Sequence, residues 1–411
     1  MSAATHAWLK LPNGPRLAVA TLPDSECAAL SIHIPAGSRD ETSLPQGLAH
    51  FVEHMVFKGT ASRSASELSL TVENGGGQLN ACTAEDHTVY EGRGEADLLP
   101  VLTEVLADMV WHASFPEPEI ALEREVIGEE ITMYRENPAD HIGDLISAAL
   151  WHDHPLGHPI SGTSDSIERI DRSRLTEFRD LHHFRDDIVI SAAGPFALDD
   201  LRKLIEPRLP ARFHAAPPRI PFDPVGTPPR QLSDRRETDQ LQLALAWHTP
   251  GRHHPSRHAL RLLSLMLGES ASSRLFLELR EERGLCYQIS TDVTFFTETG
   301  AFEIGAGLDP AAREEALHCI FREVRDLTDH GPRADELERS KRLAIAHSKL
   351  AFESTAAHAA WIGEGLMDYQ EIPSITRWRE ATHAVTPADV LAAARLVFQD
   401  RPHATAEITG P

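Results

Sequence analysis

The sequence has no long apolar run and few cysteines, and both absences limit what the chain can be. Its longest apolar runs fall well short of the about 18 residues that a membrane-spanning helix requires, so we expect no membrane partner. The four cysteines lie far apart and form no Cys-x-x-Cys pair. This excludes a cysteine-based metal framework and, in a chain of 411 residues, a disulfide scaffold.

Positive charge is scarce relative to negative charge. The chain has 39 Lys and Arg against 62 Asp and Glu, which gives a formal net charge of −23. Proteins that bind nucleic acid rely on clustered Lys and Arg, so we expect no nucleic-acid partner. The excess of carboxylates is compatible with basic or amphipathic peptide ligands, and equally with a role in solubility alone.

The first ten residues lack the features of a targeting segment. They contain no basic stretch followed by an apolar core, and they are not rich in Arg and Ser, so we expect a cytoplasmic protein. Hydrophobic residues make up 41% of the chain and charged residues 25%, as in ordinary globular proteins. A chain of this length can form two domains, each with its own core.

Prolines concentrate in one segment of the chain. Residues 210–230 hold seven of the 28 prolines, which excludes a helix or a central strand there and indicates a semi-rigid linker. We therefore predict an N-terminal domain at residues 1–209 and a C-terminal domain at residues 231–411.

The two halves resemble each other weakly, which suggests a duplication. In each half a strand leads through a turn into an apolar helix, then comes a helix that ends near a glycine, and then an extended segment. The strands are expected at 28–34 and 241–247, the helices ending near glycine at 64–74 and 273–283, and the extended segments at 78–90 and 285–296. Because the order lacks a short βαβ period, we predict an α+β fold with two homologous domains. Each domain should be a mostly antiparallel sheet packed with helices.

The segment from His50 to His54 reads His-x-x-Glu-His. On a helix, residues four apart lie one above the other and the residue at i+3 lies beside them. His50 and His54 could therefore hold one Zn²⁺ through ring nitrogens, with Glu53 next to its open position, which is the inverzincin arrangement. With 23 histidines in the chain, this pattern would occur by chance in roughly one such chain in ten. Two histidines on a solvated helix face are the alternative.

A catalytic zinc site needs a third protein ligand and an open position for water. The acidic helix expected at 117–136 is the natural donor. Glu123 and Glu130 lie two turns apart and share a face, whereas Glu129 points elsewhere. Two carboxylates on a core-facing stripe are unusual because a buried charge needs a partner. The alternative is that they lie at the margin of a solvated face.

Together these residues resemble the pitrilysin/insulinase-like metallopeptidases, the family that includes mitochondrial processing peptidase. The resemblance covers nearly the whole chain, and its further motifs lie at 36–41, 47–60, 76–81, 155–160 and 272–276. It implies that His50, His54 and Glu130 ligate one zinc ion per chain and that Glu53 is the general base. It also implies that Glu123 is a carboxylate that orients a ligand histidine.

The same resemblance assigns substrate-binding residues. Arg280 and Tyr287 match the family's Arg/Tyr pair, which binds substrate and helps to stabilise the tetrahedral oxyanion, a task suited to guanidinium and hydroxyl donors. From the sequence alone, a helix-surface Arg and a half-buried strand Tyr are the alternative. Asn80 and Ala81 match the family's edge strand, which takes peptide substrate by backbone pairing.

The resemblance implies a zinc-dependent endopeptidase that hydrolyses peptides or short unfolded segments in a closed chamber. Chains of this short, two-domain subtype resemble half of the long members, so we expect a clamshell dimer, either a homodimer or a heterodimer with a related subunit. The presence of both the zinc motif and the Arg/Tyr pair favours the homodimer. Two other functions stay open: a partner-dependent maturation peptidase for one ribosomally made peptide, and a non-hydrolytic subunit of a peptidase complex.

Overall fold

The structure is a computed structural model, and it describes residues 4–12, 14–223 and 227–410. It contains two compact units, and each is discontinuous in sequence. Unit 1 comprises Met1–Ile131, Pro159–Ile220 and Leu350–Pro373; unit 2 comprises Thr132–His158, Pro221–Lys349 and Ser374–Pro411.

Unit 1 is built on a 6-stranded sheet with the strand order β1-β2-β6-β3-β5-β4. Only the β2–β6 pair is parallel; the other neighbours are antiparallel. The strands are β1 (Thr5–Lys10), β2 (Arg16–Thr21), β3 (Cys27–Ile34), β4 (Gln78–Thr83), β5 (Thr88–Glu95) and β6 (Val189–Gly194). Strand β3 is buried over nearly its whole length, which explains its continuous apolar sequence.

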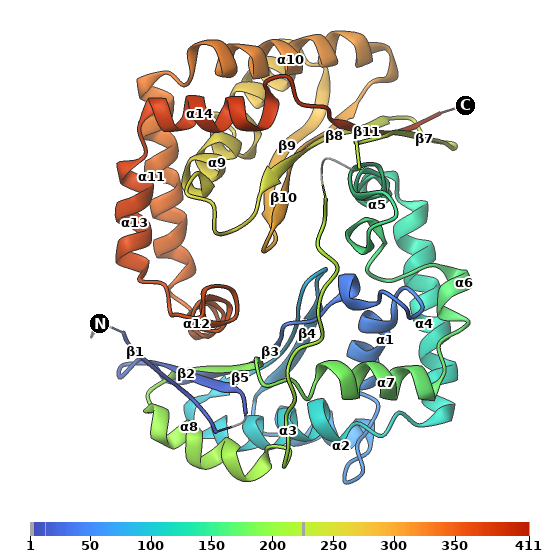
Figure 1. Ribbon diagram of the computed structural model, residues 1–411, viewed down its shortest axis with the longest axis vertical. Coiled ribbons are helices and arrows are strands. Elements are labelled where there is room, and N and C mark those ends of the chain that lie inside the picture. The colour runs from blue at the N-terminus through green and yellow to red at the C-terminus, as the bar shows by residue number, and fades with distance from the viewer. Residues whose placement is uncertain (1–3, 13, 224–226, 411) are drawn as a thin grey trace. The chain divides into compact units, whose positions relative to one another are not determined.

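Helices cover both faces of this sheet (Figure 1). One face carries large aliphatic side chains and packs against α1, α2, α3 and α8, with α7 lying on α1. The other face presents small residues of β2, β3 and β6 to α12 (Thr355–Tyr369). The remaining helices of this unit are α1 (Leu48–Met55), α2 (Ala65–Glu73), α3 (Leu99–His112), α6 (Ser164–Ile167), α7 (Arg172–His182) and α8 (Leu198–Ile205).

Helix α12 lies very close to β3 because both elements have small or specially paired residues at the contact. The buried His33 of β3 has its Nε2 atom 2.9 Å from the Ser191 hydroxyl. A Cβ atom added to Gly363 of α12 would lie 2.0 Å from that same nitrogen. Only glycine therefore permits this approach.

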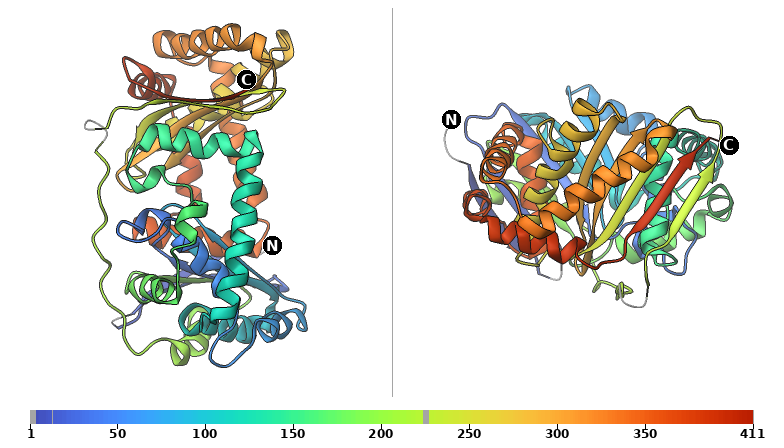
Figure 2. Two further views of the ribbon diagram at one scale, coloured as in Figure 1. Left: turned by 90° about the vertical axis from the view of Figure 1, so that its right-hand side faces the viewer. Right: turned by 90° about the horizontal axis from the view of Figure 1, so that it is seen from above.

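Unit 2 contains a 5-stranded sheet with the order β7-β11-β8-β10-β9, again with one parallel pair, β7–β11. In the view from above, β11 lies between β7 and β8 (Figure 2). The strands are β7 (Gln231–Arg235), β8 (Leu241–Pro250), β9 (Cys286–Phe295), β10 (Thr299–Leu308) and β11 (Ala404–Thr409). When β1 is set aside, the five strands of unit 1 follow the same order, which agrees with the predicted homology of the two halves.

The helices of unit 2 also cover both faces of their sheet. Helices α9 and α14 and two π-type helices, η5 and η6, pack on one face, with α10 against α14, and α5 packs on the other. The bounds are α5 (Pro138–Trp151), α9 (Arg257–Ser264), η5 (Leu265–Glu269), η6 (Phe276–Glu282), α10 (Arg313–His330), α11 (Ala334–Ala351), α13 (Ile375–Ala384) and α14 (Pro387–Phe398). Helix α4 (Glu117–Glu136) runs from unit 1 into unit 2.

The predicted α+β class with two mostly antiparallel sheets is confirmed. Residues 210–223 and 227–230 contain no helix or strand, as the prolines indicated. Each unit, however, takes one helix from the other half of the chain, α12 for unit 1 and α5 for unit 2. Residues 132–158 of the predicted domain 1–209 therefore lie in unit 2, and residues 350–373 of the predicted domain 231–411 lie in unit 1.

The extended segment expected at 78–90 differs in detail from the structure. It is a hairpin in which β4 and β5 are joined by a turn, closed by a hydrogen bond from the Ala84 N–H to the His87 carbonyl at 2.8 Å. Within the part of the chain that the structure describes, no helix is both long and apolar enough to cross a bilayer.

Candidate active site

Helix α1 carries the His-x-x-Glu-His motif, and its first turn is firmly held. Gly47 begins the helix with φ of +86°, and a Cβ atom there would lie 2.5 Å from the Ser161 carbonyl oxygen. The buried carboxylate of Glu41 accepts hydrogen bonds from the backbone N–H groups of Gly47 at 3.0 Å and Ala49 at 2.7 Å. These contacts fix where the helix starts and therefore where its histidines lie.

Three polar side chains converge beside this helix. The Nε2 atoms of His50 and His54 are 3.2 Å apart, and each lies 3.7 Å from a carboxylate oxygen of Glu130 on α4. One ligand atom from each residue falls within 4.8 Å of the others. The structure therefore brings together the three residues that the sequence nominated as metal ligands.

This donor set fits a zinc ion. Two imidazole nitrogens and one carboxylate oxygen are a ligand set of catalytic zinc sites. A tetrahedral ion separates two nitrogen ligands by about 3.3–3.4 Å, which is close to the 3.2 Å between the two imidazoles. Burial, followed by the nearby His54, lowers the pKa of His50 to about 3, which keeps its ring neutral as a metal ligand must be.

Glu123 orients the ring of His54 through a hydrogen bond. Its carboxylate accepts a hydrogen bond from His54 Nδ1 at 2.7 Å and lies 2.5 Å from Lys58 Nζ on its other oxygen. Since a carboxylate only accepts, Nδ1 carries the proton and Nε2 is free to bind a metal. Burial favours a raised pKa for Glu123, but the bonds from His54 and Lys58 outweigh it and the pKa is lowered. Glu123 thus stays ionised although its side chain is only 5% exposed.

Glu53 lies on the same helix but makes a different contact. One of its carboxylate oxygens accepts a hydrogen bond of 2.6 Å from the Thr83 hydroxyl at the end of β4. Burial raises the pKa of Glu53, and the bond from Thr83 opposes this shift. A carboxylate with a raised pKa is suited to take and return a proton near neutral pH.

Strand β4 is the edge of the unit 1 sheet, and its two nominated residues point to opposite faces. Ala81 is half-buried and packs against the main core of the unit. Asn80 faces the other side, where its amide donates to Glu91 at 3.2 Å. Asn80 also lines a cavity of about 400 Å³ together with Ser31, Gln78 and Arg93.

Arg280 and Tyr287 lie together in unit 2. The Arg280 guanidinium carbon is 5.6 Å from the centre of the Tyr287 ring and 4.8 Å from that of Phe276. The Tyr287 side chain is highly exposed (74%), as is expected of a group that receives a ligand. The structure therefore brings these two residues together, and their role in binding substrate stays a prediction.

Three residues at the site carried no role in the sequence analysis, namely Lys58, Thr83 and Glu41. Lys58 lies in the 47–60 motif, and Glu41 lies in the motif at 36–41. The two motifs were a sequence signal for Lys58 and Glu41. The contacts of all three residues depend on tertiary packing.

Comparison with known proteins gives two family matches and similar relatives. The family description "Insulinase (Peptidase family M16)" matches residues 16–164, and "Peptidase M16 inactive domain" matches residues 169–343. An uncharacterized zinc protease of Streptomyces coelicolor is 32% identical over 98% of this chain and 88% of its own length. One from Mycobacterium leprae is 30% identical over 95% and 89%, respectively.

Solved structures share the fold. A protease from Helicobacter pylori superposes with a TM-score of 0.92 at 22% identity and covers 99% of this chain and 100% of its own. A structure from Pseudomonas fluorescens, described as a peptidase M16 inactive domain, gives a TM-score of 0.91 at 20% identity, with coverage of 99% and 98%.

The chain therefore belongs to the insulinase family of peptidases, peptidase family M16. This confirms the resemblance drawn from its motifs. The family and the names of the relatives support a peptidase, and those names imply zinc.

Proposed function

We propose that the protein is a zinc-dependent endopeptidase that cleaves peptides or short unfolded segments. The observation that carries this proposal is the convergence of His50, His54 and Glu130 within 4.8 Å. Glu53, on the same helix as both histidines, supplies a carboxylate beside that cluster. In this proposal the three converging residues hold one zinc ion per chain.

The chemistry divides between the metal and the protein. A zinc ion supplies Lewis acidity that makes water nucleophilic near neutral pH and polarises a peptide carbonyl. Glu53 accepts the proton of the attacking water and delivers it to the departing amine. Thr83 holds the Glu53 carboxylate in place, and Glu123 with Lys58 holds His54.

Substrate binding uses two surfaces in this proposal. The peptide pairs with the backbone of β4 at Asn80 and Ala81, which explains a loose dependence on substrate sequence. The cavity beside Asn80 accommodates a substrate side chain. Arg280 and Tyr287 offer a guanidinium and a hydroxyl donor to substrate and to the oxyanion that forms at the scissile carbonyl.

We further propose that two chains assemble as a clamshell and enclose the reaction in a chamber. Each chain carries both the zinc motif and the Arg/Tyr pair, which favours a homodimer over a heterodimer with a related subunit. A closed chamber selects peptides and unfolded segments because a folded protein cannot enter.

The metal ligands can be tested with neighbouring residues of one helix. Glu130→Gln removes a proposed ligand, whereas Glu129→Gln changes an exposed glutamate next to it. We expect Glu130→Gln to lose zinc, measured by elemental analysis, and to stop cleaving a quenched fluorescent peptide. Glu129→Gln should retain both. If Glu130→Gln binds zinc and cleaves as well as the wild type, the proposed ligand set is wrong.

A further inference from the structure

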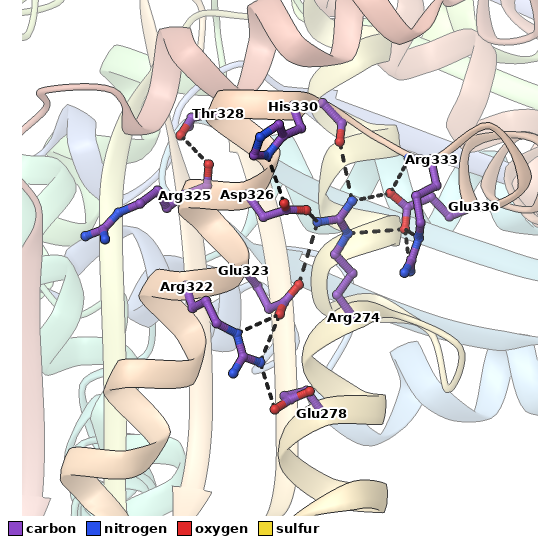
Figure 3. Close-up of polar contacts among 11 residues, drawn as sticks. Arg274, Glu278, Arg322, Glu323, Arg325, Asp326, Thr328, His330, Arg333 and Glu336 are labelled. Carbon is purple, nitrogen blue, oxygen red and sulfur yellow. Dashed lines mark hydrogen bonds and ion pairs between the residues drawn. The ribbon is translucent and has the colours of Figure 1, made fainter.

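A network of charged side chains in unit 2, with Arg274 and Glu336 buried at its centre, contacts η6, the helix that carries Arg280. Charges of both signs on α10 connect α10 to η6 and to the residues at the start of α11 (Figure 3). The network contains Arg274, Glu278, Arg283, Glu315, Arg322, Glu323, Asp326, Arg333 and Glu336. None of these residues belongs to the active site proposed above.

Arg274 is the centre of this network. Its side chain is only 4% exposed and lies two residues before η6. It donates to Glu336 of α11 through two nitrogens, at 2.5 and 3.2 Å, and to Asp326 of α10 at 2.7 Å. A guanidinium can bridge two carboxylates in this way because its donors form a rigid fork, which an ammonium group does not have.

Glu278 forms a second anchor on η6 itself. Its carboxylate pairs with Arg322 of α10 at 2.7 Å and with Arg283 just beyond the end of η6. Arg283 also reaches Glu315 on α10 at 2.9 Å. Ion pairs therefore connect η6 to α10 at three places: just before the first residue of η6, within the helix, and just after its last residue.

These ion pairs hold a helix of an unusual type. Helices of the π type are rare and occur mostly as single-turn bulges inside α-helices, frequently at functional sites. Leu279 is the buried residue of η6, and Leu275, just before the helix, is buried as well, while the Arg280 guanidinium lies over the rings of Phe276 and Tyr287. A small movement of η6 would carry Arg280 away from Tyr287.

We infer that Arg274 is a positioning residue for the Arg280/Tyr287 pair, acting through the ion network that fixes η6 on α10 and α11. This inference rests on the proposed role of that pair in binding substrate. Arg274 itself does not touch the substrate. Its effect on cleavage should therefore depend on the presence of Arg280, whereas a residue that only stabilises the fold would act equally without it.

A double-mutant cycle tests this dependence. Arg274→Met is compared with the wild type, and Arg274→Met/Arg280→Met with Arg280→Met, using kcat and KM for a quenched peptide. Measurements are made at a temperature where circular dichroism shows each variant to be folded. We expect Arg274→Met to lower kcat/KM about 10- to 100-fold in the wild type, because small misplacements at a site have such effects. In the Arg280→Met background the loss should be below about twofold.

Three further variants complete the experiment. Arg274→Lys should not restore full activity, because an ammonium lacks the planar fork that pairs with Glu336 through two nitrogens and with Asp326 through a third. Glu278→Gln cuts the second anchor and should give a smaller loss that also vanishes without Arg280, so the inference stays testable if Arg274→Met does not fold. Arg313→Met removes the ion pair of α10 with Glu407, which lies outside the network, and should leave kcat/KM unchanged.

The outcomes separate this inference from the function on which it rests. Equal losses from Arg274→Met with and without Arg280, or no loss at all, would overturn the positioning role. If Arg280→Met cleaves normally while Glu53→Gln does not, the protein is a peptidase in which the pair and its support play no part. If Glu53→Gln also cleaves normally, both proposals fail.

Discussion

At the scale of single residues, Glu123 pairs with two side chains, His54 and Lys58. Lys58 is the partner that can be replaced without changing a proposed metal ligand. The Lys58 ammonium holds the carboxylate in the orientation in which it accepts from His54. We expect Lys58→Met to weaken zinc binding about 10-fold or more, because groups that hold metal ligands typically change affinity about 10–100-fold. Competition with a chromophoric chelator measures this affinity.

The same substitution at an exposed lysine is a matched control. Lys203 has a side chain that is 76% exposed, so Lys203→Met should bind zinc as the wild type does. Unchanged zinc affinity in Lys58→Met would mean that His54 alone is sufficient to hold Glu123.

The extent to which the site could be predicted differs from residue to residue. Helix geometry alone predicts that His50 and His54 are neighbours, since any helix brings residues four apart together. Helix periodicity indicated Glu123 and Glu130 as candidates, and the resemblance to a known family selected Glu130 as the ligand. The approach of Glu130 to the two histidines depends on how α4 packs against α1. The contacts of Lys58 and Thr83 could not be predicted, because each depends on the exact packing of a different element against α1.

At the scale of secondary-structure elements, the contact between α12 and β3 limits one position to glycine. Gly363→Ala would place a methyl group 2.0 Å from His33 Nε2. We expect this to push α12 from the sheet and to destabilise the protein by about 1–3 kcal/mol, as is usual for overpacking. A lower midpoint of thermal unfolding, followed by circular dichroism, would report it.

Gly143 of α5 is a matched control, because it is also a glycine inside a helix. A Cβ atom at Gly143 would meet nothing within 4 Å. Gly143→Ala should therefore stabilise the protein by about 0.5–1 kcal/mol through its higher helix propensity. If the two substitutions shift the midpoint in the same direction, the close packing at Gly363 is not what requires glycine there.

The elements were predictable where local pattern decides them. The apolar runs at 28–34 and 241–247 are strands within β3 and β8, because buried strands read as continuous apolar segments. The turn within 78–90 was not predicted. The residues of this turn are polar, but so are many residues of the two strands that flank it, so the sequence does not mark where the strands end and the turn begins. The exchange of α5 and α12 between the units has no local signal, because which helix covers the second face of a sheet is decided by tertiary packing.

At the scale of the whole molecule, buried histidines link stability to pH. Burial lowers the pKa of His33 and of His183 to about 3, from an ordinary value of 6.5. Below pH 6.5 the unfolded chain takes up these protons and the folded chain does not, so the free energy of unfolding decreases as the pH falls toward 3. Above pH 6.5 neither histidine contributes to a pH dependence.

Urea unfolding at pH 7 and at pH 5 measures this effect. The midpoint should be lower at pH 5 for the wild type, and the decrease should be smaller for His33→Gln, which removes one buried group that titrates. An equal pH dependence in the wild type and in His33→Gln would contradict the assignment of His33 as buried and neutral.

The proposed dimer can be tested by its mass in solution. If a clamshell of two chains encloses the reaction, light scattering of the purified protein should give about twice the mass of the 45.4 kDa chain. A monomer that cleaves peptides at full rate would contradict the dimeric chamber.

In the proposed mechanism, Glu53 acts as the general base beside a zinc ion held by its neighbours. Glu53→Gln can be compared with the wild type for zinc content and for cleavage of a quenched peptide. We expect the variant to keep its zinc and its kcat to fall about 10²–10⁴-fold, the range for loss of a general base. A variant that cleaves at the wild-type rate would contradict it.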